Sequence, residues 1–359
     1  MMKRILFMVL IAIIAVSCTH NEKKVDIKQG KQGSDSVSAY DSLGKTNDSF
    51  DNDPAKQLKL NDLYVCGEVE DSGIVDLSKL QIRSKLVKET LLKDGDTVFI
   101  GAYRYDGYSL HDILNLYLLK KKNSSVFKPI VDAYVEVEND KGEKAVFSWG
   151  EIFYPNDRHE ILIAQSVMRI VPVKSKDMWP LPDQSKLVVA NDLLTHRNIS
   201  NPVKITVKSF DIQLPVKKGL KPLYSDNVNL HVEDKIVDNI KSLPPLNEEK
   251  VNTIFYGRGR GIHSTDVQKG IYLKNYLKQF ISIKESDLQH SLVIVAAADG
   301  YRAVFSLSEI CNRNDQSEVL FKCDHRLTDN GVFRIMPLCD FFSDRAVKGI
   351  SDIYYFSNY

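Results

Sequence analysis

The chain contains KAVFSWGEIFYPNDRHEILIA at residues 144–164 and, 158 positions later, RAVFSLSEICNRNDQSEVLFK at residues 302–322. Other segments on both sides of these two also recur, and they recur in the same order. The further pairs are TVFIGAYR (97–104) with TIFYGRGR (253–260), GYSLHDIL (107–114) with GIYLKNYL (270–277), YVEVENDKGE (134–143) with LVIVAAADGY (292–301), VMRIVP (167–172) with VFRIMP (332–337), and HRNISNPVKI (196–205) with DRAVKGISDI (344–353). Ordered similarity of this kind is typical of a repeated structural unit, so the sequence predicts a tandem duplication.

Each copy combines signals for short strands with signals for short helices. In the first copy an apolar run at 97–101 predicts a strand, and the leucines and isoleucine of 110–114 fall on one face of a helix. Alternating residues at 134–137, a glycine-bearing turn and the run AVF predict a hairpin. The second copy repeats the pattern at the paired positions. The mixture predicts the α+β fold class.

Two serine–glutamate pairs have the spacing of a capping box. Ser148 precedes Glu151 by three residues, and Ser306 precedes Glu309 by three. At this spacing the serine accepts a backbone N–H and the carboxylate reaches back to the start of the helix. Because the two pairs are equivalent, we expect Glu151 and Glu309 to have capping or salt-bridge roles rather than catalytic ones.

The N-terminal residues 1–17 predict a signal peptide. Two basic residues precede an apolar run at 5–16, which is too short to span a bilayer. The segment AVSC at 15–18 resembles the lipobox of bacterial lipoproteins, in which the chain is cut before the cysteine and the thiol is lipid-modified. The resemblance implies lipidation of Cys18 and a membrane partner, with the protein anchored in a bacterial cell envelope on the periplasmic side or at the surface. The alternative is an ordinary secretory signal.

Composition changes sharply after the signal. Residues 18–57 have few aliphatic side chains and many Ser, Asp, Asn, Lys and Gly, which predicts a disordered tether. The rest of the chain is long enough for two domains, predicted at 58–212 and 213–359. The net charge is +1 without a long basic block, so no nucleic-acid partner is predicted.

The ordered set of motifs resembles the sulfite-oxidase-type molybdopterin-binding domain. In the first copy the resemblance is carried by VCGEV (65–69), 107–114 and 144–151. In the second copy it is carried by 270–277, DGYRAVFSLSE (299–309), 334–337 and Arg345. The resemblance implies two degenerate tandem copies of a mixed β-sheet domain with short helices, in an envelope lipoprotein.

The chain departs from that family at the position of the metal ligand. In the family a cysteine thiolate, just after the strand that precedes the Gly-x-x-Leu helix, binds molybdenum. Here Gly101 and Gly257 mark that place, and Cys66 lies in an earlier strand. Glycine offers no side-chain ligand to a metal, so we expect no molybdopterin cofactor and no enzymatic activity. The alternative is a molybdopterin-dependent oxidoreductase that keeps the pterin without a protein thiolate.

The stretch YGRGRGIHSTDVQKG at 256–270 is the most ligand-like part of the sequence. Alternating glycines allow close backbone approach, and Arg258 and Arg260 offer planar donors for an oxyanion. His263 and Asp266 add groups that can exchange protons. We predict a ligand site at these four residues; the alternative is a mobile glycine-rich loop with solvated arginines.

Tyr103 and Arg104 form a second candidate, an aromatic and basic rim in the first copy. Loops that follow strands are where ligands usually bind, so both residues are included as ligand-binding candidates. The alternative is that the tyrosines cover a sheet edge, and that Arg104, equivalent to Arg260, has a structural role.

The histidines and cysteines show no metal-binding pattern. The eight histidines are dispersed along the chain, and no paired-thiol motif occurs, so no protein-held metal is predicted. Cys311 could pair with Cys323 or Cys339 in an exported protein, or all could be buried free thiols.

Together these features predict a lipid-anchored envelope protein that binds a small anionic or metal-containing ligand, or a partner protein. A structural or assembly lipoprotein is a further alternative. The sequence does not identify the ligand, the oligomeric state or the leaflet of the anchor.

Overall fold

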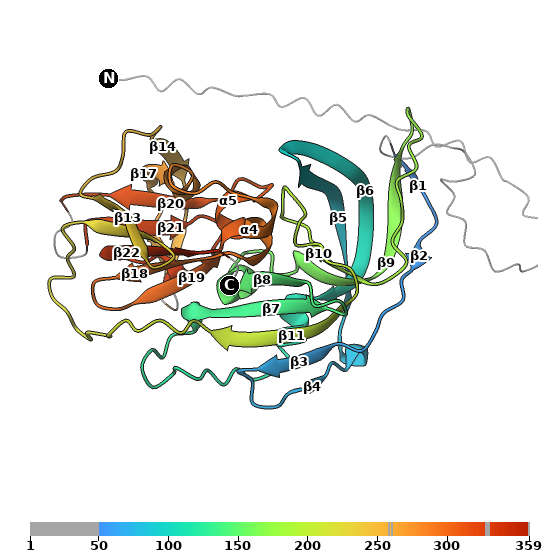
Figure 1. Ribbon diagram of the computed structural model, residues 1–359, viewed down its shortest axis with the longest axis horizontal. Helices are drawn as coiled ribbons and strands as arrows, with labels where there is room; N and C mark the ends of the chain where they lie inside the picture. Colours follow the sequence, from blue (N-terminus) through green and yellow to red (C-terminus); the bar gives the residue numbers. More distant parts are fainter. Residues whose placement is uncertain (1–49, 258, 260, 327–330, 358–359) are drawn as a thin grey trace, which may run out of the picture. The chain divides into compact units, whose positions relative to one another are not determined.

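The computed structural model describes residues 50–257, 259, 261–326 and 331–357. Strands make up 46% of the structure and helices 12%, and the small sheets have a four-blade propeller-like arrangement (Figure 1). The predicted α+β fold, a tandem duplication of a sulfite-oxidase-like domain, is therefore wrong. The physical reason lies in the helices: each predicted helix is only five residues long and follows the end of a strand, so the helices do not form a layer.

A six-stranded sheet occupies the first part of the chain. Its central path is β1–β9–β6–β5, and β2 and β10 also pair with β9. Its long strands β5 and β6 form a curved hairpin, seen in teal in Figure 1. The strands are β1 (Phe50–Asn52), β2 (Lys56–Gln57), β5 (Ile82–Lys93), β6 (Asp96–Ser109), β9 (Ile161–Pro172) and β10 (Lys186–Val189). Residues 50–52 and 56–57, at the end of the predicted tether, are thus strands paired with β9.

Two five-stranded sheets have the same pattern of strand directions. In the first, β11 is parallel to β3 and antiparallel to β7, and β7 forms a hairpin with β8. In the second, β22 is parallel to β12 and antiparallel to β18, and β18 forms a hairpin with β19. The first sheet consists of β3 (Tyr64–Gly67), β4 (Gly73–Ile74), β7 (Ala133–Asn139), β8 (Lys144–Ser148) and β11 (Pro202–Ser209). The second consists of β12 (Val228–Val232), β13 (Lys235–Ile240), β18 (Leu292–Ala297), β19 (Arg302–Ser306) and β22 (Ile350–Phe356).

A four-stranded sheet in the order β14–β17–β20–β21 lies in the second part of the chain, with a small β15–β16 hairpin. Its strands are β14 (Glu249–Asn252), β17 (Val267–Tyr272), β20 (Val319–Cys323) and β21 (Phe333–Pro337). The hairpin consists of β15 (Phe255–Gly257) and β16 (Gly261–Ser264).

The α-helices are short, and all except α4 begin where a strand ends. Ser148 and Ser306 cap the helices that follow β8 and β19, and the complete predicted capping box forms at Ser306 and Glu309. At the first site Ser148 caps the helix, but the Glu151 carboxylate binds other partners, described below. The α-helices are α1 (Leu110–Leu114), α2 (Trp149–Phe153), α3 (Leu273–Leu277), α4 (Glu285–His290) and α5 (Leu307–Cys311); the 3-10 turns are η2 (Leu77–Lys79), η3 (Ile130–Asp132) and η4 (Ser343–Arg345). Among the described residues, none of the helices combines the length and the apolar character needed to cross a membrane.

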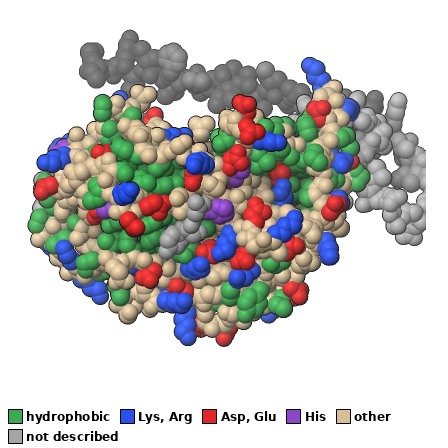
Figure 2. Space-filling model, in the orientation of Figure 1, with side chains coloured by type: hydrophobic (Ala, Val, Ile, Leu, Met, Phe, Trp, Pro, Cys, Tyr) green, Lys and Arg blue, Asp and Glu red, His purple; other side chains and the backbone are tan. Residues whose placement is uncertain are grey.

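Each half of the chain has a large apolar core, and a smaller cluster joins the halves. The joining cluster packs Tyr134, Val146 and Phe210 of the first half against residues of β18 and β19. The cysteines Cys66, Cys311, Cys323 and Cys339 are free. Side chains of both charge signs are interspersed on the face shown in Figure 2.

Buried arginines also join the two halves through hydrogen bonds. Arg197, 2% exposed, pairs with Asp192 at 2.7 and 2.8 Å and donates from Nη1 to Glu151 Oε1 at 2.5 Å. The same nitrogen lies 3.3 Å from Ser306 Oγ in the second half, and Ser306 Oγ donates to Glu151 Oε2 at 2.5 Å. The expected salt-bridge role of Glu151 is confirmed.

Arg345 makes the corresponding set of contacts in the opposite direction. It pairs with Asp340 at 2.6 and 2.8 Å and donates from Nη1 to Glu309 Oε2 at 2.8 Å. Nη1 also donates to Ser148 Oγ of the first half at 3.0 Å. Gly150 makes room for this guanidinium, because a Cβ there would lie 2.3 Å from Arg345 Cδ. The salt-bridge role of Glu309 is confirmed as well.

This network predicts a pH-dependent stability. In this network two arginines face four buried carboxyls. Burial raises the pKa of Glu151 from 4.5 to about 7; the charge of Arg197 lowers this pKa, and the charge of Glu309 raises it further. The folded chain therefore binds this proton more tightly than the unfolded chain. The contribution of Glu151 to stability is full below pH 4.5 and decreases as the pH rises to 7. We expect Glu151→Gln to flatten this decrease, measured as the free energy of unfolding in denaturant between pH 4 and 8.

Glu160 provides the control for that measurement. Burial raises its pKa to about 7 too, although it lies outside the arginine network. The Glu160→Gln variant should remove a separate part of the pH dependence and leave the part due to Glu151. An unchanged pH profile in Glu151→Gln would contradict the assignment.

Candidate functional site

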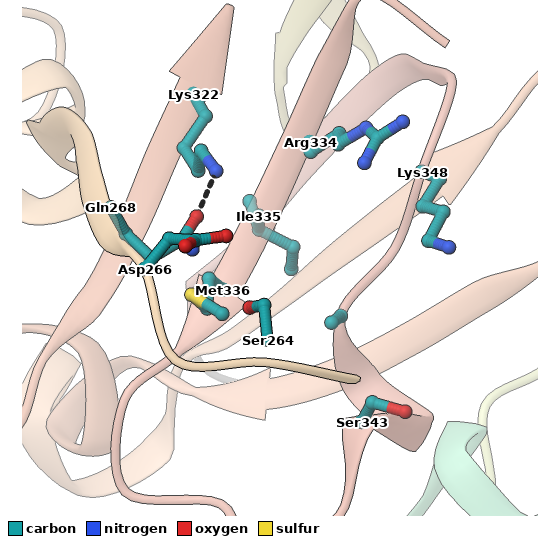
Figure 3. Close-up of a pocket in the computed structure, with 10 residues that line it drawn as sticks. Ser264, Asp266, Gln268, Lys322, Arg334, Ile335, Met336, Ser343 and Lys348 are labelled. Atoms are coloured by element: carbon teal, nitrogen blue, oxygen red, sulfur yellow. Dashed lines mark hydrogen bonds between the residues drawn. The ribbon is translucent and has the colours of Figure 1, made fainter. Parts of the chain in front are cut away.

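A polar pocket of about 470 Å³ opens on the four-stranded sheet of the second half (Figure 3). One wall comes from the chain between the end of β16 and β17. Another comes from β20 and β21, and a third from η4 and the segment between η4 and β22. The lining residues are Ser264, Asp266, Gln268, Lys322, Arg334, Ile335, Met336, Ser343, Ala346 and Lys348.

The strand register places three cationic side chains next to one another. Lys322 of β20 is the direct antiparallel partner of Arg334 on β21, so both side chains lie on one face of the sheet. On its other side Arg334 forms an isolated bridge with Lys348. Arg334 is therefore flanked by a lysine on each neighbouring segment.

Burial disfavours the charged forms of all three side chains in this cluster. Burial and the charge of Arg334 lower the pKa of Lys322 and of Lys348, and burial lowers the pKa of Arg334 itself. Asp324 partly opposes the effect on Lys322 and Arg334. All three shifts disfavour the charged forms, so a bound anion would relieve the repulsion.

A glycine allows the β17 wall to approach the cations. A Cβ on Gly270 would lie 2.4 Å from Phe321 O, so only glycine lets β17 approach β20 so closely. Gln268 is consequently buried against Lys322, whose Nζ donates to the Gln268 side-chain oxygen (Figure 3). Arg334 Nε donates to Gly331 O at 3.3 Å.

The structure brings only part of the predicted site to this pocket. Asp266 lines it, exposed on the wall opposite Arg334, together with Ser264 and Gln268 of the predicted stretch 256–270. Arg258, Arg260 and the side chain of His263 lie outside the described part of the chain.

Tyr103 and Arg104 lie elsewhere, on β6 of the six-stranded sheet. Tyr103 is 1% exposed and its hydroxyl donates to Pro180 O at 2.8 Å, which makes it part of a core. Arg104 lines a different pocket and donates to Asp106 Oδ2 at 3.2 Å.

The cations Lys322, Arg334 and Lys348 were missed as site residues in the sequence. Lys322 ends the repeated stretch and Arg334 begins the Arg-Ile-x-Pro segment, so both were visible as strand residues. Their proximity depends on the β20–β21 register and on the course of the chain before β22. No local motif encodes either feature.

One cluster in the described part of the chain has the composition of a metal site. His111 Nδ1 lies 3.0 Å from Asp112 Oδ1, and His159 Nδ1 lies 3.6 Å from Asp112 Oδ2 and 3.1 Å from Ser109 Oγ. Two imidazoles and a carboxylate are common zinc ligands. Arg83, however, donates twice to Asp112 Oδ2, at 3.2 and 3.3 Å, so the carboxylate already has a cationic partner. The absence of a protein-held metal stays a prediction.

No family model matches this sequence, and no curated protein is significantly similar to it. These comparisons therefore do not identify the chain as a sulfite-oxidase-type molybdopterin domain.

Proposed function

We propose that this protein is a lipid-anchored cell-envelope protein that binds a small anionic ligand in the pocket on β17, β20 and β21. The observation that carries the proposal is the row formed by Lys322, Arg334 and Lys348. Burial lowers the pKa of all three, and the charge of Arg334 lowers the pKa of both lysines further. A cluster of this kind gains stability when an anion binds. Lipidation of Cys18 and the location in a bacterial envelope are parts of the same proposal, based on the lipobox.

The pocket favours a compact ligand with an anionic head. A volume of about 470 Å³ is within the range of small-molecule sites, roughly 300–1,000 Å³. The planar guanidinium of Arg334 suits two oxygens of a carboxylate or phosphate, and the lysines supply point charges. On the opposite wall Asp266 and Ser264 carry oxygens that can accept hydrogen bonds, which favours a ligand that also carries hydroxyl or ammonium groups. The proposal requires neither molybdopterin nor catalysis.

The test is a binding titration with defined anions. Residues 47–359 form one compact unit, so a fragment of these residues serves for the measurements. Inorganic phosphate and glycerol phosphate are titrated at low ionic strength by calorimetry. We expect Arg334→Ala to weaken binding roughly 10- to 100-fold, because hydrogen bonds to charged groups contribute about 1.5–3 kcal/mol. The Arg334→Ala variant should remain folded, because removing the guanidinium relieves its repulsion of Lys322 and Lys348.

Arg326→Ala is the matched control, because Arg326 is an arginine of the second half whose side chain is 89% exposed and does not line the pocket. It should bind within about twofold of the parent, as expected for a screened surface charge. The double variant Arg258→Ala with Arg260→Ala is measured beside it, since these arginines stay predicted ligands. If the parent binds neither phosphate nor glycerol phosphate, or if Arg334→Ala binds them equally well, the proposal is wrong.

A further inference from the structure

A second and larger pocket lies on the six-stranded sheet, away from the basic pocket. Its volume is about 970 Å³, and its floor is one face of β5, β6 and β9. Trp179, Leu193 and Asn314 also line it. We refer to this pocket as the β5–β6–β9 groove.

The floor of the groove follows strand alternation. Leu86 pairs with Arg104 across β5 and β6, and Arg104 pairs with Met168 across β6 and β9, so the three side chains form one row. Two residues further along β9, Ile170 points to the same side. The other face of the sheet is already covered, because Tyr103 and Tyr105 pack there in a core.

Large apolar side chains around the groove remain accessible to solvent. Leu86 is 69% exposed, Leu193 56% and Phe99 48%, although Phe99 packs edge-on against Trp179 with ring centroids 5.2 Å apart. Such an exposed apolar surface, arranged around one concave site, is typical of a binding site.

The groove contains a cationic position within its apolar floor. Arg104 donates from Nη2 to Asp106, while its Nε is buried and has no hydrogen-bond partner among the described residues. Lys88 also lines the groove and is exposed. Asp192 reaches the groove, but Arg197 holds its carboxylate with two hydrogen bonds. The positive groups that a ligand can reach are therefore Lys88 and the Arg104 side chain, which is 38% exposed although Asp106 already pairs with it.

We infer that the β5–β6–β9 groove binds an amphipathic carboxylate with a single alkyl chain, that is, a fatty acid. The alkyl chain lies along Leu86, Phe99, Met168 and Ile170, and the carboxylate accepts hydrogen bonds from Arg104 with Lys88 nearby. The floor is too apolar for the hydrophilic anions proposed for the basic pocket. The inference is independent of that proposal, because the two sites have no lining residue in common.

The test is a chain-length series of carboxylates with the 47–359 fragment. Hexanoate, octanoate and decanoate are titrated below their micellar concentrations. Because each buried methylene contributes about 0.8 kcal/mol, affinity should increase roughly tenfold for every two methylenes. Binding should saturate at one molecule per chain. Equal affinities for hexanoate and decanoate would overturn the inference.

Variants separate the two ends of the ligand. Leu86→Glu should weaken decanoate binding at least about tenfold, through lost contact and charge repulsion. Leu118→Glu is the matched control, because Leu118 is 66% exposed outside the groove, and it should bind decanoate like the parent. Arg104→Met should weaken binding of decanoate about tenfold but leave binding of decanol unchanged.

Phosphate binding should be unaffected in these variants. The proposals for the basic pocket and for the β5–β6–β9 groove are therefore tested independently of each other. Decanoate that binds Leu86→Glu as tightly as the parent would show that the groove is not the site. Saturable binding of an apolar peptide without binding of decanoate would assign the groove to a protein partner instead, and would also overturn the inference.

Discussion

Replacing Arg345 by methionine is expected to lower the free energy of unfolding by about 3–5 kcal/mol, the usual cost of removing one member of a buried ion pair. Arg345 is fully buried, and its partners Asp340 and Glu309 have side chains only 2% exposed. Methionine would leave two carboxylates without their cation in a region from which water is excluded. The measurement is denaturant unfolding of the 47–359 fragment at pH 7.

Two comparisons make the result specific to the buried charge. Arg326→Met removes an arginine that is 89% exposed and should change stability by less than about 0.5 kcal/mol. Adding Asp340→Asn and Glu309→Gln to Arg345→Met should recover part of the loss, because the unpaired charges are then gone. A loss below about 1 kcal/mol in Arg345→Met would mean that water or another cation replaces the arginine.

Replacing Gly67 by alanine is expected to cost about 4 kcal/mol or more, within the range reserved for severe local defects. Gly67 has φ of +95°, which alone costs an L-residue about 1–3 kcal/mol. In addition, an alanine Cβ would lie 2.2 Å from Val207 O on the neighbouring strand β11. The strands cannot separate easily, because Glu68 N donates to the same carbonyl at 2.8 Å.

Gly142→Ala isolates the conformational part of this cost. Gly142 has φ of +82°, but no atom lies within 4 Å of a Cβ built there. Its replacement should cost about 1–2 kcal/mol, the strain of the left-handed conformation. Thermal or denaturant unfolding of the two variants gives the comparison. Equal losses in both would show that β3 and β11 can separate around the added methyl group.

Local signals in the sequence predicted local structure well and fold class poorly. The hairpins β7–β8 and β18–β19 and the serine caps lie where alternation and spacing placed them. The α+β class was wrong because amphipathic spacing over 110–114 indicates a helix but not its length, and the helix ends after five residues.

One pair of segments that look alike in sequence is not equivalent in the structure. VMRIVP at 167–172 lies within the long strand β9, whereas VFRIMP at 332–337 contains β21. In the sheets β21 occupies the position of β10, because each pairs antiparallel with the strand that continues from the repeated stretch. Asp192 and Asp340 follow β10 and β21 at the same distance, and each binds the arginine five residues later.

The sequence located one residue of the candidate pocket but not its cations. An anionic ligand was predicted from Arg258 and Arg260 and stays a prediction, whereas Asp266 of the same stretch lines a basic pocket. The three cations that dominate this pocket come from separate strands and one loop. Each of these residues looks like an ordinary surface lysine or arginine until the register of β20 and β21 is known.

The crossed hydrogen bonds of Arg197 and Arg345 have a consequence for biosynthesis. The first half emerges from the ribosome, and through any export channel, before Ser306 and the strands β18 and β19 exist. Until then the apolar face around Tyr134, Val146 and Phe210 has nothing to pack against. A chain that stops before β18 would therefore leave this apolar face of the first half uncovered.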